Sequence, residues 1–310
     1  MPPHGHEPVL LHEALDLLDP QPGQVAVDCT LGRGGHALAI AERLGPDGLL
    51  IGIDQDPDNL AYAEQRLANA GCQLHLVHAN FGELARVLGE ANVGGVDLLL
   101  ADLGVSTNQL LDGEHGLSFA DAEAPLDMRL DPRLRLTAAD IVNRWDAKRI
   151  ADTLFQHAQE RLSRRIARKI IETRGRAPIR TVGELADLVR RCVPRPKGRR
   201  GHAIDPATRT FMALRMAVNG EPDALGKLLD ALPIALNPGG RAAIISFHSG
   251  EDRLVKHRLR ELDSFGTLAL LTKRPVVPGD AEERDNPRSR SAKLRAARRP
   301  ATASAGGGDP

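Results

Sequence analysis

The sequence contains few cysteines, three in 310 residues, and none of them in CxxC spacing. Disulfide frameworks and zinc sites both need several cysteines at short spacing, so neither is expected, and a reducing compartment is favoured. The N-terminus lacks a basic stretch followed by an apolar one, and no apolar run approaches membrane length. We therefore expect a soluble, cytoplasmic protein with no membrane partner. His4 and His6 have no ligand partners at suitable spacing, and no metal site is expected.

The formal net charge is zero, which taken alone argues against a nucleic-acid partner. The charges are nevertheless unevenly placed: residues 1–110 hold 15 acidic and 4 basic side chains, whereas residues 161–200 hold 14 basic and 3 acidic ones. Residues 284–300 add seven basic side chains against one acidic. This asymmetry predicts an acidic ligand-binding part beside a basic surface for a phosphate backbone, with solvated helix faces as the alternative. The loop Arg195-Pro-Lys-Gly-Arg-Arg200 favours the phosphate interpretation, because Pro and Gly break any helix there.

Residues 25–54 carry the most specific pattern in the chain. An apolar strand ends on Asp28, a turn and a helix follow, and a second apolar strand ends on Asp54; the turn contains Gly32, Gly34 and Gly35. Glycines let a backbone approach a ligand closely, and an acidic residue about 20 positions further on can bind ribose hydroxyls. Dinucleotides and S-adenosylmethionine are both bound in this way.

The acidic residues around this turn distinguish the two ligands. A pyrophosphate would lie at the helix N-terminus, where the carboxylate of Asp28 would repel it, and Asp56 and Asp58 follow Asp54. S-adenosylmethionine carries a sulfonium and an ammonium group and no phosphate, so neighbouring carboxylates attract it. The pattern favours S-adenosylmethionine, and a nicotinamide-dependent dehydrogenase remains the alternative.

Apolar periodicity predicts an α/β domain interrupted by a helical segment. Alternating strands and helices up to about residue 109 indicate a parallel sheet covered by helices, and the sheet pattern resumes near residue 206. We expect a sheet domain from 1–109 and 206–298, an inserted helical substrate-recognition domain over 110–205, and a disordered tail over 299–310. The expected strands are 25–28, 49–53, 73–78, 96–101 and 241–247, and the expected helices are 9–18, 35–44, 59–69, 137–145, 147–173, 182–192, 207–218 and 223–236.

Ligands bind at the carboxyl ends of parallel strands, where several polar side chains are expected. Asp54 would bind the ribose, and Phe81 would either stack on the adenine or pack in the core. His248 follows the last predicted strand and could accept a proton or hold a base, with Ser249 expected to cap the next helix. Ser249 is not expected to act as a nucleophile, because Phe247 stands where a hydrolase turn needs glycine.

These motifs together resemble one family, the bacterial 16S rRNA cytosine-N4 methyltransferases (RsmH or MraW), over nearly the whole chain. The blocks that carry the resemblance are His6–Leu10, Asp28–His36, Asp54–Pro57, Ala79–Phe81, Asp102–Ser106, Gly116–Phe119, Pro125–Arg129, Pro206–Phe211, Phe247–Ser249, Glu251–Arg253 and Asn286–Arg295. The resemblance implies a Rossmann-like class I S-adenosylmethionine-dependent methyltransferase sheet with an inserted helical domain. The sequence departs from the family pattern at Asp205, Met212 and Gly250, which concerns the substrate side.

The resemblance also implies site residues and a substrate. The implied S-adenosylmethionine contacts are Gly34, Gly35, His36, Asp54, Phe81, Asp102 and Gln109. The implied reaction methylates the N4 amine of the decoding-site cytidine at position 1402 of 16S rRNA in the small ribosomal subunit. Asp102 and His248 are the catalytic candidates. Another nucleic-acid amino-methyltransferase, a dehydrogenase and a non-catalytic RNA-binding factor remain alternatives, and a homodimer is left open.

Overall fold

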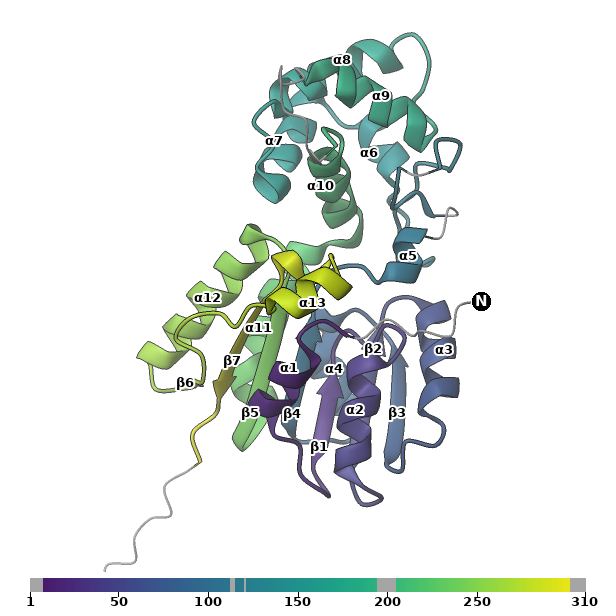
Figure 1. Ribbon diagram of the computed structural model, residues 1–310. Coiled ribbons are helices and arrows are strands. Elements are labelled where there is room, and N and C mark those ends of the chain that lie inside the picture. Colours follow the sequence, from purple (N-terminus) through teal and green to yellow (C-terminus); the bar gives the residue numbers. More distant parts are fainter. Residues whose placement is uncertain (1–7, 112–114, 120, 194–204, 302–310) are drawn as a thin grey trace, which may run out of the picture. The chain divides into compact units, whose positions relative to one another are not determined.

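The chain divides into two compact units in the computed structural model, which describes residues 8–111, 115–119, 121–193 and 205–301 (Figure 1). The first unit is formed by the described parts of Met1–Gly104 and Asp223–Pro310, and the second by those of Val105–Pro222. The insertion predicted at 110–205 falls within the second unit, which extends further at both ends. The predicted basic loop at 195–200 and most of the predicted tail lie outside the described residues.

The described residues of the first unit form a seven-stranded sheet in the order β3-β2-β1-β4-β5-β7-β6, so the mixed α/β fold class is confirmed. Strands β1 to β5 pair in parallel, and β7 pairs antiparallel with β5 and β6. The strands are β1 (Val25–Asp28), β2 (Leu49–Asp54), β3 (Gln73–His78), β4 (Val96–Asp102), β5 (Leu236–Ser246), β6 (Ala269–Leu270) and β7 (Lys293–Arg298). The first four match predicted strands to within a residue, and β5 begins five residues before the strand predicted at 241–247. Strands β6 and β7 were not predicted.

Helices cover both faces of this sheet, and alternate residues of β4 show how each face is buried. Leu98 and Leu100 belong to the core formed with α1 to α3, whereas Leu99 and Ala101 belong to the core formed with α4, α11 and α12. Successive side chains of a strand point to opposite faces, so a strand buried on both sides is apolar throughout. The helices of this unit are α1 (Leu11–Leu18), α2 (Gly35–Leu44), α3 (Pro57–Leu67), α4 (Leu84–Glu90), α11 (Glu221–Ala235), α12 (Ser249–Ser264) and α13 (Asp280–Asp285).

Side-chain caps set the start of one α-helix and of one 3₁₀ turn near the carboxyl edge of the sheet. Helix α3 begins at Pro57, two residues before the predicted start, because the Asp56 carboxylate accepts a hydrogen bond from the Asp58 amide at 2.9 Å. Helix α4 was not predicted. It follows a 3₁₀ turn, η1 (Phe81–Glu83), in which Asn80 and Glu83 form a reciprocal capping box.

The second unit is helical and has its own apolar core. Its helices are α5 (Thr107–Leu111), α6 (Ala138–Arg144), α7 (Ala147–Ala158), α8 (Ser163–Arg174), α9 (Val182–Cys192) and α10 (Thr208–Asn219). The single helix predicted over 147–173 is wrong: α7 stops where Gln159 takes the left-handed conformation (φ 52°), and the Glu160 carboxylate accepts a hydrogen bond from the Leu162 amide. Ile150, Leu154, Ile166 and Ile170 still bury one common apolar face, which is why the pattern looked continuous.

Within the described ranges, none of the helices combines the length and apolar character needed to cross a lipid bilayer. In the same residues, no group of three or more His, Cys, Asp or Glu side chains is placed to hold a metal ion.

Candidate active site

The carboxyl ends of five parallel strands meet at one edge of the sheet in the first unit. Strand order reverses beside β1, which lies between β2 and β4, and open α/β sheets bind ligands at such a point. Asp28, Asp54 and Asp102 are the last residues of β1, β2 and β4. Of the predicted cofactor residues, only Gln109 lies outside this unit. It is in α5 of the second unit, where its side chain accepts a hydrogen bond from the Ser106 amide.

The glycine turn after β1 is held by the carboxylate of Asp54. Gly32 and Gly34 have φ values of 52° and 73°, in the left-handed region that favours glycine. Asp54 Oδ2 accepts a hydrogen bond from the Gly32 amide at 2.7 Å, and Oδ1 accepts one from the Asp56 amide at 2.8 Å. Asp54 therefore fixes the turn and the start of α3 together.

Close packing restricts position 35 to glycine, and the first turn of α2 has no side-chain cap. A Cβ at Gly35 would lie 2.6 Å from Pro8 Cγ, so close packing against Pro8 requires glycine at that position. No side chain caps the first turn of α2, whose N-cap residue is Gly34. Uncapped amides and the helix dipole make this terminus suited to a carboxylate or another anion.

Three carboxylates at this edge have a raised pKa, and burial is the largest cause for each. Burial raises the pKa of Asp28 to about 7, helped by the negative charge of Asp54. Burial also raises the pKa of Asp54 to about 6. The pKa of Asp102 is raised well above its ordinary value by burial and by the charges of Asp28 and Glu251. Such a cluster is costly to ionise without a cation nearby.

Asp102 is positioned by a residue that the sequence did not single out. The Asp102 amide donates a hydrogen bond to Thr30 Oγ1 at 2.6 Å, and the Thr30 amide donates one to Asp28 Oδ1 at 3.1 Å. Thr30 thus joins the ends of β1 and β4. Asp102 Oδ1 is buried and has no hydrogen-bond partner among the described residues, although a buried oxygen of this kind normally has one.

His36 is buried in the first turn of α2, between the N-terminal segment and Asp102. Its Nε2 lies 3.0 Å from the Val9 carbonyl oxygen, which can only accept, so Nε2 carries the hydrogen. Its Nδ1 lies 3.9 Å from Asp102 Oδ2. Burial lowers the pKa of His36 to about 4, so the ring is neutral at pH 7. Its contact with the cofactor stays a prediction.

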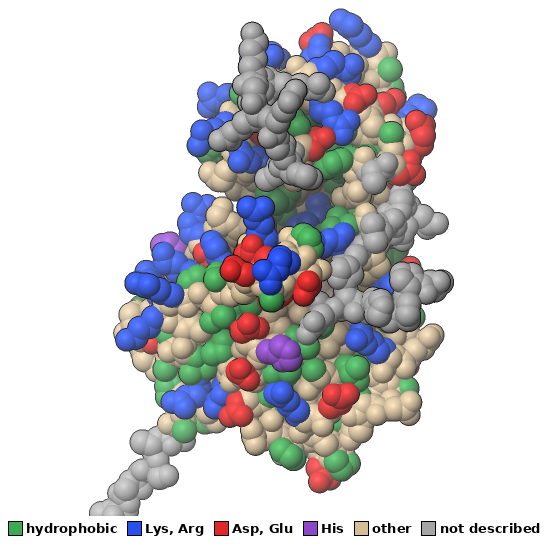
Figure 2. Space-filling view, in the orientation of Figure 1, with side chains coloured by type: hydrophobic (Ala, Val, Ile, Leu, Met, Phe, Trp, Pro, Cys, Tyr) green, Lys and Arg blue, Asp and Glu red, His purple; other side chains and the backbone are tan. Residues whose placement is uncertain are grey.

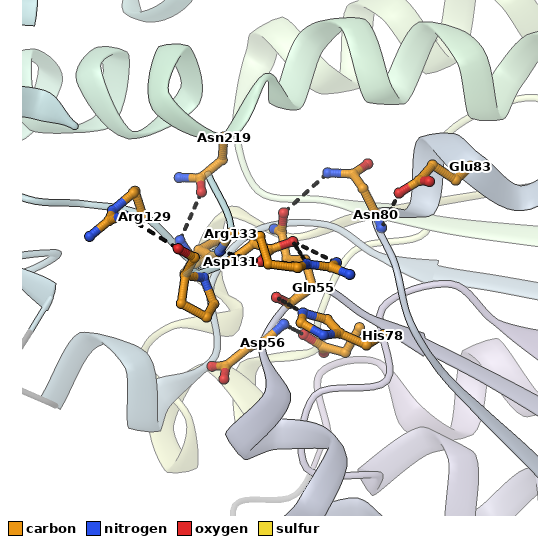
Figure 3. Close-up of polar contacts among 12 residues, drawn as sticks. Gln55, Asp56, His78, Asn80, Glu83, Arg129, Asp131, Arg133 and Asn219 are labelled. Carbon is orange, nitrogen blue, oxygen red and sulfur yellow. Dashed lines mark hydrogen bonds and ion pairs between the residues drawn. The ribbon is translucent and has the colours of Figure 1, made fainter. Parts of the chain in front are cut away.

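Polar contacts join the ends of β2 and β3 around Phe81. Figure 3 shows Asn80 Nδ2 donating to Gln55 Oε1 at 3.1 Å and His78 Nε2 lying 3.0 Å from the Gln55 carbonyl oxygen. Phe81 follows Asn80 and packs against the apolar core with part of its ring accessible. Both predicted interpretations of Phe81, core packing and stacking on a base, are compatible with this partial burial.

His248 caps helix α12, a role that was predicted for Ser249. The N-cap of α12 is His248 and not Ser249: its Nδ1 accepts hydrogen bonds from the Gly250 and Glu251 amides at 3.2 and 3.3 Å. Glu251 completes the capping box by accepting a hydrogen bond from the His248 amide at 3.4 Å. It also accepts one from the Phe247 amide at 3.0 Å, and its Oε1 lies 3.1 Å from His248 Nε2. An imidazole can replace a hydroxyl cap because its unprotonated nitrogen is an acceptor.

The second unit contains a loop held by arginine–carboxylate pairs before α6. Arg129 makes a bidentate ion pair with Asp127, and Arg133 contacts both oxygens of Asp131 (Figure 3 labels Arg129, Asp131 and Arg133). Asn219 accepts a hydrogen bond from the Leu130 amide at 2.9 Å and donates to the Met128 carbonyl at 2.8 Å. These contacts fix the loop to the end of α10.

Basic side chains gather on the visible face of this unit over α7 and α8 (Figure 2). In the described part of the chain, four exposed arginines in and just before α8 form no ion pair: Arg161, Arg164, Arg165 and Arg168. The basic stretch 284–300 differs, because several of its cations are bound within the fold. Lys293 and Arg295 pair with Asp252, and Arg299 donates to the Leu236 carbonyl. Its predicted role as a phosphate-binding surface is therefore weakened.

Comparison with known proteins places the chain in a family. The sequence profile of the MraW methylase family matches residues 3–300. The Geobacter sulfurreducens protein named ribosomal RNA small subunit methyltransferase H is 46% identical over 308 residues, covering 94% of this chain and 98% of its own. The Synechococcus elongatus protein of the same name is 47% identical over 295 residues, covering 95% and 94%.

Among solved structures, TrmN from Thermus thermophilus aligns with a TM-score of 0.45 at 15% identity, over 94% of this chain and 48% of that one. The profile match and the sequence identities decide the assignment. This chain belongs to the MraW methylase family, and it is a methyltransferase.

Proposed function

We propose that this protein transfers a methyl group from S-adenosylmethionine to the N4 amine of the decoding-site cytidine, position 1402, of 16S rRNA in the small ribosomal subunit. Family membership and the names of the relatives support an rRNA substrate of the small subunit. The resemblance of the sequence motifs to the 16S rRNA cytosine-N4 methyltransferases implies the cytosine amine and its position. A substrate of this kind implies a cytoplasmic location. The methylase family offers no support for the dehydrogenase alternative.

The observation that carries the cofactor assignment is the cost of ionising Asp28 and Asp102 at the sheet edge, where burial and neighbouring carboxylates raise the pKa of both. Asp28 is 1% exposed, Asp102 has a buried oxygen without a described partner, and no described basic side chain other than neutral His36 approaches Asp102. A ligand with a sulfonium and an ammonium group would relieve this repulsion, whereas a diphosphate would increase it. The uncapped first turn of α2 suits the carboxylate of the same ligand.

S-adenosylmethionine, when bound, supplies an electrophilic methyl group. Asp54 would hold the ribose hydroxyls, Phe81 would contact the adenine, and the turn at Gly34, Gly35 and His36 would lie along the methionine portion. The contact of Gln109 with the cofactor, which the family resemblance implies, stays a prediction. The task of these side chains is to fix the methyl group in line with the attacking amine, since alignment supplies much of the rate of such transfers.

The N4 amine of cytosine is a weak nucleophile because its lone pair is delocalised into the ring, and a proton must leave it during or after transfer. Asp102 is the proposed acceptor: its raised pKa makes the ionised carboxylate a stronger base, and a neighbouring cation favours that ionised form. His248 is the second proposed acceptor. Its Nδ1 lone pair is used by the cap of α12, so taking up a proton there would require release of the cap.

The second unit is proposed to hold the RNA. The four exposed arginines in and before α8 are free of ion pairs with described residues and can contact phosphates. A base must be unstacked before its amine can reach a pocket, which suits a single-stranded or loop segment.

The proposal is tested with small ribosomal subunits from cells that lack this protein. Incubation with the purified protein and S-adenosylmethionine carrying a tritiated methyl group should label 16S rRNA, and mass spectrometry of its nucleosides should show one new methyl on a cytidine amine. Label on another base, or on no RNA, would contradict the proposed reaction. Tight subunit binding without label would favour the non-catalytic RNA-binding alternative.

A further inference from the structure

Two arginines and a tyrosine lie together beside the glycine turn of the first unit. The Arg33 guanidinium carbon lies 4.6 Å from the centroid of the Tyr62 ring, and Tyr62 is 46% exposed. Arg66, one turn after Tyr62 on α3, donates a hydrogen bond from Nη1 to the Arg33 carbonyl at 3.2 Å. We call these three residues the Arg33 cluster.

The Arg33 cluster is unusual for its part of the chain. Residues 1–110 contain only four arginines and lysines against 15 carboxylates. Arg86 is committed to Glu83 and Glu90, at 2.8 and 2.7 Å. Within the described ranges, Arg33 and Arg66 form no ion pair in spite of the surrounding acidic residues. Two of the four basic side chains in residues 1–110 therefore lie in one cluster, and neither is paired with a described carboxylate.

Packing fixes the Arg33 cluster to the turn itself. A Cβ built on Gly34 would lie 3.5 Å from Ala63 and 3.6 Å from Leu67, so the turn rests directly on α3. Tyr62 and Arg66 are four residues apart and share one face of that helix. The stacked guanidinium presents its outer face to solvent, since Arg33 is exposed. The arrangement is preformed and loses little side-chain freedom on binding a ligand.

We propose that the Arg33 cluster contacts a single-stranded segment of the RNA substrate, with a base stacked on the Arg33–Tyr62 pair and a phosphate bound by Arg66. Arginine planes and aromatic rings are the surfaces on which unpaired bases stack, and unpaired guanidinium groups bind phosphates. The inference rests on the proposed function. It adds an RNA contact on the unit that carries the carboxylate site, independent of the basic α8 surface.

The test measures the affinity of the full chain for unmethylated small ribosomal subunits by filter binding, over a range of salt concentrations. We expect Tyr62→Ala and Arg66→Ala each to weaken binding at least about fivefold, as removal of one stacked base or phosphate contact does. Tyr62→Phe should bind like the wild type because it keeps the ring. Arg66→Ala should also reduce the slope of log affinity against log salt by about 0.7.

Controls separate this contact from folding and from the cofactor site. Arg43→Ala removes an exposed arginine from α2 of the same unit and should leave subunit affinity unchanged. Affinity for S-adenosylmethionine by calorimetry and the melting temperature should be unchanged in Tyr62→Ala and Arg66→Ala. Subunit binding within about twofold of wild type in both variants, or a parallel loss of cofactor binding, would overturn the inference. If the wild type itself fails to methylate the subunits, the proposed function fails instead.

Discussion

Single side chains at the sheet edge combine structural and chemical tasks. Asp54 orders the glycine turn through the Gly32 amide and is also the proposed ribose ligand, so its position is fixed before any ligand arrives. Thr30 links Asp28 to the Asp102 amide, which places two carboxylates on adjacent strands under mutual repulsion. Preorganisation of this kind costs stability in the free protein and favours a cationic ligand.

The buried carboxylate of Asp28 makes a pH dependence predictable. Its pKa rises from an ordinary 3.8 to about 7 in the folded chain. Between these values the folded state keeps a proton that the unfolded state has released, so this residue's contribution to stability is lost as pH rises from about 4 to 7. Asp28→Asn cannot ionise. Its free energy of unfolding relative to wild type should therefore increase by roughly 2 to 3 kcal/mol between pH 5 and pH 8.

Denaturant unfolding at the two pH values measures this difference. Asp47→Asn, which alters an exposed carboxylate of the same unit, serves as the control and should show no such change. A difference between Asp28→Asn and wild type that stays constant with pH would show that Asp28 is not held protonated in the folded state.

The predictions made from the sequence were most accurate for the positions of residues at the ends of strands. Asp28, Asp54 and Asp102 all end strands, as the apolar patterns indicated. Thr30 was missed because nothing local marks a hydroxyl that bonds to an amide 72 positions away.

For helices and strands, the apolar periodicity predicted that an element exists more accurately than it predicted the residues at which the element begins and ends. The central strands were predicted because burial on both faces makes them apolar throughout. Strand β7 was missed because Lys293, Arg295 and Arg298 make it look like a charged tail, whereas Asp252 pairs with the first two. The break between α7 and α8 depends on the backbone of Gln159, which no apolar pattern reveals. Helix α4 could have been found from the capping box at Asn80 and Glu83, which begins the 3₁₀ turn that leads into it.

The cap of α12 gives a test of His248 at this scale. His248→Ala should lower the free energy of unfolding by about 1 kcal/mol, because two amides lose their acceptor. His248→Asn should restore stability, since asparagine is a good N-cap, but it cannot take up a proton. We expect its single-turnover methylation rate to remain below that of wild type. If His248→Asn methylates at the wild-type rate, His248 takes no part in the reaction and serves only as the cap of α12.

For the whole molecule, the two units divide the charge of the chain. The acidic N-terminal residues belong to the sheet unit with the carboxylate site, and the basic residues 161–193 belong to the helical unit. The overall charge asymmetry was visible in the sequence. The sequence did not show which basic side chains form ion pairs. Lys148 pairs with Asp152 and Arg176 with Glu172, whereas Arg164 and Arg168 pair with no described residue.

This division predicts that RNA and cofactor affinities can be changed separately. The double change Arg164→Ala with Arg168→Ala should weaken binding to small ribosomal subunits about tenfold or more at 0.1 M salt, since two phosphate contacts are lost. Affinity for S-adenosylmethionine should be unchanged. The matched control, Lys148→Ala with Arg176→Ala, removes two exposed cations that are already paired and should have little effect. Equal effects of the two pairs would show that only total charge matters.

The most direct test of the account is a calorimetric titration of the purified protein with S-adenosylmethionine, repeated with Asp54→Ala and with a nicotinamide dinucleotide. We predict saturable binding of S-adenosylmethionine, at least about tenfold weaker binding in Asp54→Ala because charge-assisted hydrogen bonds to the ribose are lost, and no binding of the dinucleotide. Asp54→Asn, which keeps an acceptor for the Gly32 amide, and Asp58→Ala, an exposed carboxylate nearby, control for folding and for charge. Uptake of the dinucleotide without S-adenosylmethionine, or equal affinity in Asp54→Ala, would contradict the central claim that these carboxylates bind a cationic methyl donor.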